Sequence, residues 1–329
     1  MRRLSIAALV VGIVASVAPA AGGFSSVSYP GCTIPVATKF RATGSRARCI
    51  QLALAARGYS NHRADGLFGV RTHLTVRDFQ RVNGLKVDGI VAEQTASLLG
   101  IWGGSVPKSN QVHESRVIGY SVRGRPITAY RLGTPGGKVV LAVGNVHGDE
   151  PGGLAVSFYL RYQAVIPEGL DVWVIDTMNP DALASRSRVN ARNVDVNRNF
   201  STPDWIRVAG GTKNYSGWGA GSEPETRAMM SFIRAIRPTL AVWWHQPYGV
   251  IDLQGTAAEP ELIADYAALT GLPLSPVPCG KTPCIGNASV YVNTRVVGAT
   301  SFIVELPTRI SLENAATHAR AFLTIAQKA

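Results

Sequence analysis

The C-terminal two thirds of the chain alternates short apolar runs with segments of helical periodicity. A short apolar run between turn signals predicts a buried strand, whereas apolar positions three or four residues apart predict a helix with one buried face. The predicted strands are 139–143, 172–175, 240–244 and 301–304, and the predicted helices are 154–162, 223–236, 260–269 and 312–327. This alternation favours an α/β fold in which helices cover a sheet.

Residues 30–100 follow a different pattern and contain an internal repeat. Asp65-Gly66 precedes one apolar-periodic segment, and Asp88-Gly89 precedes another 23 residues later. Asp-Gly pairs favour turns, and apolar positions at helical spacing around them predict helices. We therefore expect three short helices joined by Asp-Gly turns.

The repeat resembles the peptidoglycan-binding domain family, a three-helix unit. The matching residues, in the family's order, are Gln51-Leu52, Gly58-Tyr59, Asp65-Gly66-Leu67-Phe68-Gly69, Phe79-Gln80, Asn83-Gly84-Leu85, Asp88-Gly89 and Thr95. The resemblance implies binding to the cell wall. A helical spacer without a ligand is the alternative.

The first 20 residues have the pattern of a secretory signal peptide. Arg2 and Arg3 precede an apolar stretch from Leu4 to Val17, and residues 18–20, Ala-Pro-Ala, have the small side chains of a cleavage site. A membrane anchor is the alternative, but the apolar stretch is short for a bilayer span. We expect a secreted, cell wall-associated protein without stable membrane insertion after cleavage.

The predicted organisation is a signal peptide at 1–20, a peptidoglycan-binding domain at 30–100, a linker at 101–112 and a catalytic domain at 113–329. Glycine, serine and proline mark the linker, and 329 residues are enough for two domains. The net charge of +12 favours anionic partners. Because export argues against nucleic acid, we expect peptidoglycan or its stem peptides as the partner, bound by a monomer.

Four cysteines in an exported chain favour disulfides. The simplest scheme pairs Cys32 with Cys49 and Cys279 with Cys284. A zinc cluster of all four is the alternative, but neither pair has the close spacing of zinc-binding cysteines.

The stretch His147-Gly148-Asp149-Glu150 directly follows an apolar run. An imidazole and a carboxylate at a strand end are suited to one divalent cation, and zinc is the usual ion for mixed nitrogen and oxygen ligands. His245 follows another predicted strand and is the best candidate for a third ligand, because sites in α/β sheets gather at the carboxyl ends of strands. The other four histidines fit a structural role; they are His62, His73, His113 and His318.

Residues 188–200 are rich in arginine and asparagine. An arginine fork with an amide beside it suits a carboxylate. Asp195 could accept the free ring proton of a metal-bound histidine and so fix its tautomer. Taken alone, the segment is typical of a solvated basic loop.

Glu305 lies at the end of a predicted apolar strand. Burial of a carboxylate there is costly in free energy, which suggests that the residue has a functional role. A carboxylate near a zinc-bound water can take its proton, which makes Glu305 the predicted general base and later proton donor. The alternative is a strand-end residue that pairs with an arginine.

Together these motifs resemble the zinc carboxypeptidase family over most of residues 113–329. The resemblance rests on four separated elements in the family's order, which are His147-x-x-Glu150, Asp195-Val196-Asn197-Arg198-Asn199, His245 and Glu305. It implies a mixed sheet of about eight strands between helices. It also implies one zinc ion held by His147, Glu150 and His245, with water as the fourth ligand.

The resemblance implies roles for the remaining candidates. Glu305 would be the general acid/base, Asn197 and Arg198 would hold the free carboxylate of the substrate, and Asp195 would support His147.

Arg188 would polarise the scissile carbonyl, with Arg186 and Arg192 as close competitors. Many digestive members carry a mobile tyrosine upstream of the catalytic glutamate, and Tyr291 lies in that region. The short catalytic region and the ending Glu305-Leu306-Pro307 are similar to the branch of murein tripeptide amidases, which cut the γ-D-glutamyl–diaminopimelate bond.

We therefore expect a secreted zinc peptidase or amidase that hydrolyses amide bonds in peptidoglycan stem peptides. One alternative is a general secreted carboxypeptidase that removes C-terminal residues from peptides. Another is a non-catalytic wall-binding protein, against which the intact set of ligands and Glu305 argues.

Overall fold

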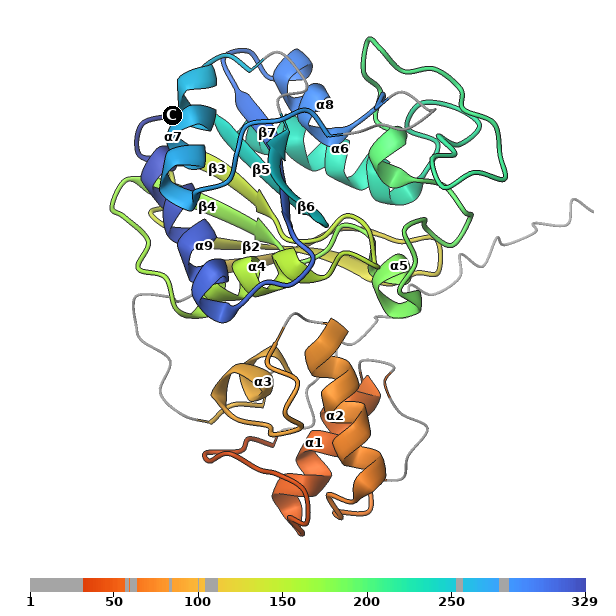
Figure 1. Cartoon of the computed structure of the whole chain (residues 1–329), viewed down its shortest axis with the longest axis vertical. Helices are drawn as coiled ribbons and strands as arrows, with labels where there is room; N and C mark the ends of the chain where they lie inside the picture. Colours follow the sequence, from red (N-terminus) through yellow and green to blue (C-terminus); the bar gives the residue numbers. More distant parts are fainter. Residues whose placement is uncertain are drawn as a thin grey trace, which may run out of the picture.

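The structure, a computed structural model, describes residues 32–56, 59, 64–82, 85–99, 101–103, 112–252, 257–277 and 284–329. A small helical unit lies against a larger α/β unit (Figure 1). The predicted signal peptide and most of the predicted linker lie outside the described residues. Within those residues, no helix combines the length and the hydropathy needed to cross a membrane.

In the described part of the chain, a mixed sheet of seven strands forms the centre of the α/β unit, in the order β1-β2-β4-β3-β5-β7-β6. Its strands are β1 (Glu114–Tyr120), β2 (Pro126–Gly133), β3 (Lys138–Val143), β4 (Leu170–Ile175), β5 (Leu240–His245), β6 (Tyr248–Asp252) and β7 (Thr300–Pro307). Strands β4, β3, β5 and β7 run parallel, and antiparallel strands extend both sides. The apolar runs predicted these four parallel strands, because such strands are buried on both faces.

Helices cover both faces of the sheet, so the α/β unit has three layers (Figure 1). Helices α4 (Gly152–Tyr162), α7 (Pro260–Thr270) and α9 (Leu312–Ala326) share one apolar core with the sheet. Helices α6 (Pro224–Ile236) and α8 (Ala288–Arg295) share a second core on the opposite face. Periodicity predicted α4, α6, α7 and α9 but missed α8 and α5 (Pro180–Ser185), which are too short to carry a clear periodic signal.

The sheet of the described residues has one strand fewer than the eight expected. Beyond β6, Leu274 pairs with Ile251 through a single parallel bridge. The Ile251 N–H donates to the Pro273 carbonyl at 2.9 Å, and the Ser275 N–H donates to the Ile251 carbonyl at 3.0 Å. This edge position is therefore taken by a segment that pairs at one residue and does not continue as a strand.

The N-terminal unit contains the three predicted helices, α1 (Ser45–Ala56), α2 (Val70–Val82) and α3 (Glu93–Leu98), which enclose one apolar core. A disulfide joins Cys32 to Cys49, as the local pairing scheme predicted. Cys284 is also disulfide-bonded, whereas Cys279 lies outside the described residues. The alternative of a zinc cluster of four cysteines is therefore wrong.

The first half of the internal repeat is organised by a buried glutamine. The Gln51 amide nitrogen donates to Asp65 Oδ1 at 2.8 Å and to Thr72 Oγ1 at 3.1 Å. The Gln51 amide oxygen accepts the Gly66 N–H at 2.9 Å. The side chain of α1 therefore holds the Asp-Gly turn that leads into α2.

The second half repeats the same network one helix later. The Gln80 amide nitrogen donates to Asp88 Oδ1 at 3.0 Å and to Thr95 Oγ1 at 3.1 Å, and the amide oxygen accepts the Gly89 N–H at 2.7 Å. The sequence repeat is thus a repeat of hydrogen bonds in which each glutamine fixes the turn before the next helix.

Replacing Gln80 with leucine should destabilise the N-terminal unit. The substitution keeps the volume but leaves the buried Gly89 N–H and Thr95 hydroxyl without their partner, which costs about 1–3 kcal/mol for each unsatisfied group. We expect a lower midpoint in thermal unfolding of Gln80→Leu. The control is Gln94→Leu at a half-buried position of α3, and equal midpoints for the two variants would contradict the role of the network.

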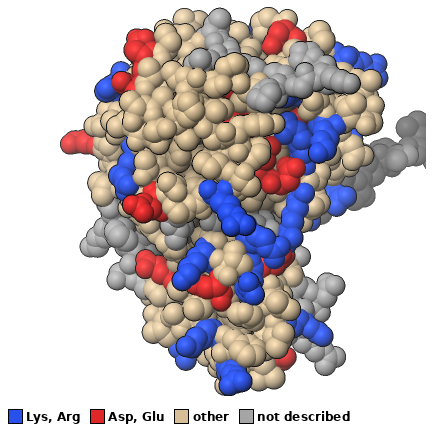
Figure 2. Space-filling view, viewed as in Figure 1, with Lys and Arg blue, Asp and Glu red and all other residues tan. Residues whose placement is uncertain are grey.

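Basic side chains are spread over both units. Figure 2 shows Lys and Arg interspersed with acidic residues, and a group of them where the two units meet. On this face, positive charge is therefore concentrated at the junction.

A chain of hydrogen bonds crosses the core between β5, α7 and α9. Trp244 Nε1 donates to the Tyr266 hydroxyl at 3.1 Å, and that hydroxyl lies 2.8 Å from His318 Nδ1. Burial lowers the pKa of His318 to about 4. The ring is therefore neutral at pH 7, and its Nδ1 can accept a hydrogen bond from the tyrosine hydroxyl. His318 thus has a structural role, as the sequence predicted.

Acidification should destabilise the α/β unit through His318. Because its pKa of about 4 in the folded state lies below the ordinary 6.5, the unfolded chain binds the extra proton between these values, and stability falls as the pH falls. Between pH 6.5 and pH 4, the free energy of unfolding should fall further in the native protein than in His318→Gln. We expect the difference between the two falls to be up to about 3 kcal/mol. Denaturant unfolding at several pH values measures the drop, and equal slopes would show that His318 is not responsible.

Candidate metal centre

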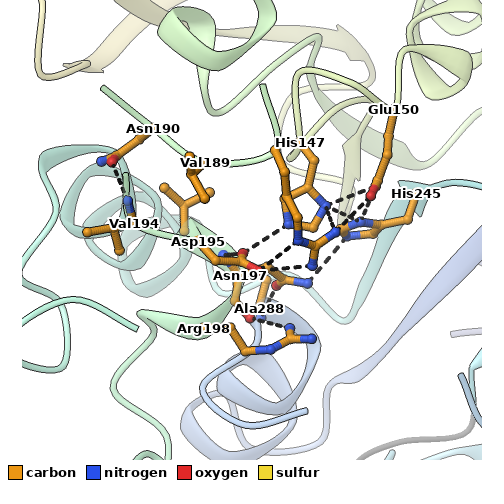
Figure 3. Close-up of polar contacts among 12 residues, drawn as sticks. His147, Glu150, Val189, Asn190, Val194, Asp195, Asn197, Arg198, His245 and Ala288 are labelled. Atoms are coloured by element: carbon orange, nitrogen blue, oxygen red, sulfur yellow. Dashed lines mark hydrogen bonds and ion pairs between the residues drawn. The ribbon is translucent and has the colours of Figure 1, made fainter. Parts of the chain in front are cut away.

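Three candidate ligands converge at the carboxyl ends of the parallel strands (Figure 3). His147 Nδ1 lies 2.9 Å from Glu150 Oε2, and His245 Nδ1 lies 2.8 Å from the same oxygen. One ligand atom from each residue lies within 4.8 Å of the others, and all three side chains are buried. Two imidazole nitrogens and a carboxylate oxygen are a donor set that suits zinc. The residues therefore fit the ion that the sequence predicted.

The turn that carries the first two ligands is fixed from behind. Asn145 Nδ2 donates to the carbonyls of His147 at 2.6 Å and of Glu150 at 3.0 Å. Gly148 packs directly on α5, where a Cβ would lie 1.9 Å from the carbonyl oxygen of Ala182. A larger residue at position 148 would therefore push the turn away from α5 and displace both ligands.

Asp195 orients the ring of His147. The Nε2 atom of His147 lies 3.0 Å from Asp195 Oδ1, which leaves Nδ1 for a metal. The same carboxylate accepts the Asn197 N–H at 2.9 Å and so caps the 3₁₀ helix Val196–Arg198. One fully buried aspartate thus joins the metal centre to the segment proposed to hold the substrate.

Arg188 reaches the centre, whereas its two competitors do not. Its guanidinium donates to Asp195 Oδ2 at 2.9 Å and to Glu150 Oε1 at 3.0 Å. Arg186 instead pairs with an aspartate of the N-terminal unit, and Arg192 faces a glutamate at the start of α6. Of the three arginines, Arg188 is therefore the one placed to stabilise charge near the ligands.

Arg198 and Asn197 lie beside the centre on the 3₁₀ helix (Figure 3). Asn197 Oδ1 accepts the Ala288 N–H at 2.9 Å, which fixes its amide. Arg198 is 7% exposed, and its buried Nε has no hydrogen-bond partner among the described residues. A buried cation with a free N–H is suited to an anionic group that enters the pocket.

Glu305 faces the centre from β7, where parallel pairing sets it opposite His245. Its Oε2 is buried without a hydrogen-bond partner in the described part of the chain. Burial and the nearby Glu150 carboxylate raise the pKa of Glu305 to about 8. A carboxyl group that exchanges its proton near neutral pH is suited to general acid–base chemistry.

The charges of the centre favour a cation. Burial and Arg188 lower the pKa of His147, but Glu150 and Asp195 outweigh them and raise it to about 9. Burial would raise the pKa of Glu150, yet the two imidazoles hold it well below its usual range. The pKa of His245 is lowered, chiefly by burial. Two buried carboxylates thus stabilise positive charge where a metal would lie.

A pocket of about 350 Å³ opens over the centre. Sequence analysis did not single out several polar residues of its lining, which are Gln246, Tyr248, Asp252, Lys213, Asn214 and Asn287. The first three follow His245 closely in the sequence, and the position of polar residues just after a strand-end ligand was the signal that could have found them.

Tyr291 does not lie in this pocket. It is 2% exposed on α8, where Arg234 donates to its hydroxyl at 2.8 Å and Phe200 packs against its ring. The tyrosine that lines the pocket is Tyr248, which is 51% exposed. Tyr291 is therefore a core residue, although it lies in the region of the sequence where digestive members carry the mobile tyrosine.

Comparisons with known proteins relate the chain to two families. Residues 107–251 match the family described as zinc carboxypeptidase, and residues 43–99 match the family described as peptidoglycan binding domain. Over these residues the α/β unit is similar to zinc carboxypeptidases. His147, Glu150 and His245 fall within the matched residues, whereas Glu305 follows them and is placed by the structure alone.

Curated proteins similar to this chain include a plant and a bacterial protein. Identity is 32% with carboxypeptidase SOL1 of Arabidopsis thaliana, over 39% of this chain and 28% of that one. It is also 32% with murein peptide amidase A of Vibrio campbellii, over 41% of this chain and 58% of that one. The chain thus covers less than two thirds of either relative.

Solved structures show the same fold. The murein-tripeptide amidase MpaA of Escherichia coli O157 superimposes with a TM-score of 0.51 at 24% identity, over 68% of this chain and 98% of that one. Carboxypeptidase A of Helicoverpa armigera gives a TM-score of 0.57 at 19% identity, over 65% of this chain and 68% of that one. Because both identities are under 25%, these likenesses show the fold alone.

Replacing Asp195 with asparagine should weaken zinc binding. The amide keeps the size of the side chain but loses the charge that orients His147 and pairs with Arg188. Removal of such a supporting group lowers metal affinity about 10–100-fold. Competition with a chromogenic chelator measures the affinity, and Asp265→Asn, at a surface ion pair with Lys328, serves as the control. Equal affinities would contradict the role given to Asp195.

Proposed function

We propose that this chain is a zinc-dependent peptidase or amidase that hydrolyses an amide bond in peptidoglycan stem peptides. The observation that carries the proposal is the buried His-Glu-His centre. Beside it, one carboxyl oxygen of Glu305 and the Nε–H of Arg198 have no hydrogen-bond partner among the residues that the structure describes. A metal, a proton-transfer group and an anion-binding group within one pocket are the components of a hydrolase for substrates that bear a carboxylate.

His147, Glu150 and His245 would hold the zinc ion. The chemistry that zinc supplies in such a site is a lower pKa of water and polarisation of a carbonyl group. Glu305 takes a proton from the attacking water and delivers it to the nitrogen of the leaving amine. Arg188 lies beside the ligands, where its guanidinium stabilises negative charge that develops on the scissile carbonyl oxygen.

Asn197 and Arg198 would select the substrate by its free carboxylate. Their side chains line the pocket on the α8 side of the centre, and the Nε–H of Arg198 has no partner within the described part of the chain. Burial strengthens such a charged hydrogen bond because water does not compete for it. A substrate whose carboxylate lies at a different distance from the scissile bond would be positioned poorly.

The N-terminal unit supports a cell-wall substrate. Its match to the peptidoglycan-binding family, and the likeness of the catalytic domain to proteins named murein peptide amidase A, point in the same direction. A wall-binding domain raises the effective concentration of a polymeric substrate. We further propose that the protein is secreted through the predicted signal peptide and acts at the cell wall, on the γ-D-glutamyl–diaminopimelate bond.

Replacing Glu305 with glutamine should abolish most of the activity. Glutamine cannot exchange the proton, and loss of a general acid–base lowers kcat by about 10²–10⁴-fold. Mass spectrometry of defined muropeptides, with zinc-loaded protein and with chelator, measures hydrolysis, and zinc content is checked in parallel. Glu313→Gln, at an exposed position of α9, is the control.

Three outcomes would contradict the proposal. An unchanged rate in Glu305→Gln rules out the mechanism. Faster removal of C-terminal residues from ordinary L-peptides than cleavage of muropeptides would indicate a general carboxypeptidase, the activity suggested by the similarity to carboxypeptidase SOL1. A zinc-loaded protein that digests neither substrate would be a binding protein.

A further inference from the structure

A second cavity lies between the two units and joins the catalytic pocket. It has a volume of about 780 Å³, and the N-terminal unit contributes Arg81, Leu85 and Val87 to its lining. The catalytic domain contributes, among others, Arg309 and Ile310 from the segment after β7. The cavity is therefore a groove with one wall from each unit.

The groove and the catalytic pocket share part of their lining. Asp149, Glu150, Gln246 and Pro247 border both cavities. Since Glu150 is a candidate metal ligand, the groove begins at the metal centre. Asn197 and Arg198 line only the catalytic pocket, so the groove leaves the centre on a different side from the carboxylate-binding residues.

The side chain of Gln246 fixes the backbone segments that lie between the two cavities. Gln246 Nε2 donates to the Pro307 carbonyl at 2.7 Å, and Gln246 Oε1 accepts the Gly152 N–H at 2.8 Å. These bonds tie the segment that carries Arg309 to the start of α4. The catalytic wall of the groove is thus part of the framework that positions the metal ligands.

The N-terminal wall is also fixed in place. Phe158 of α4 is 2% exposed and belongs to the apolar core of the N-terminal unit, with Tyr162 packed against it. Arg186 forms an ion pair with Asp78 of α2. An apolar contact and an ion pair therefore hold the end of α2 beside the catalytic domain.

The groove carries positive charge on both walls. Arg81 is exposed and shares the single carboxylate of Asp78 with Arg186. Arg309 is exposed and has no ion-pair partner among the described residues. Asp149, at the border with the catalytic pocket, is the acidic residue of the lining besides Glu150. Figure 2 shows the basic side chains that gather at this junction.

We propose that this groove binds the acyl part of the substrate and recognises a carboxylate there through Arg81 and Arg309. The N-terminal unit then forms one wall of the substrate site, in addition to tethering the protein to the cell wall. The inference rests on the proposed function. If the amine product of the reaction lies toward Arg198, the acyl part of the substrate must extend from the scissile carbon in another direction. The groove is the cavity that continues in that direction. In a stem peptide, the acyl part carries the α-carboxylate of γ-linked D-glutamate.

The test uses two soluble peptides that differ in one group. L-alanyl-γ-D-glutamyl-diaminopimelate carries the carboxylate, and its D-isoglutaminyl analogue carries a carboxamide at the same carbon. Because both peptides are soluble, tethering to a polymer has no part in the result. We expect the full-length zinc-loaded protein to prefer the carboxylate peptide about tenfold in kcat/KM, through KM.

Arg81→Ala and Arg309→Ala should each reduce this preference to about twofold or less, through a higher KM for the carboxylate peptide. The zinc content and the thermal unfolding midpoint of each variant report correct folding. The control is Arg71→Ala, at the other end of α2 and outside the groove lining, which should keep the full preference. A preference that survives in both groove variants would overturn the inference. So would a loss only of retention on insoluble wall, since that outcome assigns the arginines to tethering.

Equilibrium binding separates this inference from the proposed function. Calorimetry with zinc-loaded Glu305→Gln protein, and with the same protein carrying Arg81→Ala, compares the affinities for the two peptides without hydrolysis. If the wild-type protein cleaves neither peptide, the proposed function fails, and the binding data still decide the groove. A carboxylate preference in Kd that disappears with Arg81→Ala supports the groove, and equal Kd values for both peptides overturn it.

Discussion

Parallel pairing of β5 with its neighbours β3 and β7 is the constraint on which the site depends. It brings three carboxyl ends to one edge of the sheet, so that His147, His245 and Glu305 meet although they are far apart in the chain. The pairing sets His245 directly opposite Glu305. A slip by one residue would turn one of these side chains to the opposite face of the sheet. The extensive burial of these strands makes such a slip costly, because the apolar residues of both cores would have to move with it.

The second constraint is the pairing of buried charge. The carboxylate of Asp195 is fully buried, and its burial would be costly in free energy without partners. It contacts His147, Arg188 and the start of the 3₁₀ helix. The contacts that stabilise this carboxylate therefore position the candidate metal ligands and the proposed substrate-binding segment together. Against this background, Glu305 and Arg198 stand out, because each keeps a buried polar atom without a partner among the described residues. Those two atoms are the ones that the proposed chemistry uses.

The two units of the chain are built on different principles. The N-terminal unit has a small apolar core and relies on a disulfide and on buried glutamines that fix each Asp-Gly turn. The α/β unit has two large cores and positions the candidate site through strand ends. Their contact through Phe158 lets the first unit reach the edge of the site formed by the second.

The sequence by itself determined the elements with strong local signals. Continuous apolar runs identified the four parallel strands, periodic segments identified four of the longer helices, and the repeat identified the helices of the N-terminal unit. It also singled out His147, Glu150, His245 and Glu305, because a polar residue at the end of an apolar strand stands out against its surroundings. The sequence did not identify β1, β2 and β6, because these strands are only partly buried and carry a weak apolar signal. It also contains no distances, so it could not show that Tyr291 is near the site in sequence but not in space. The resemblance favoured Arg188, but only the tertiary structure separated it from Arg186 and brought Arg81 to the groove. Both results depend on packing between segments that no local pattern records.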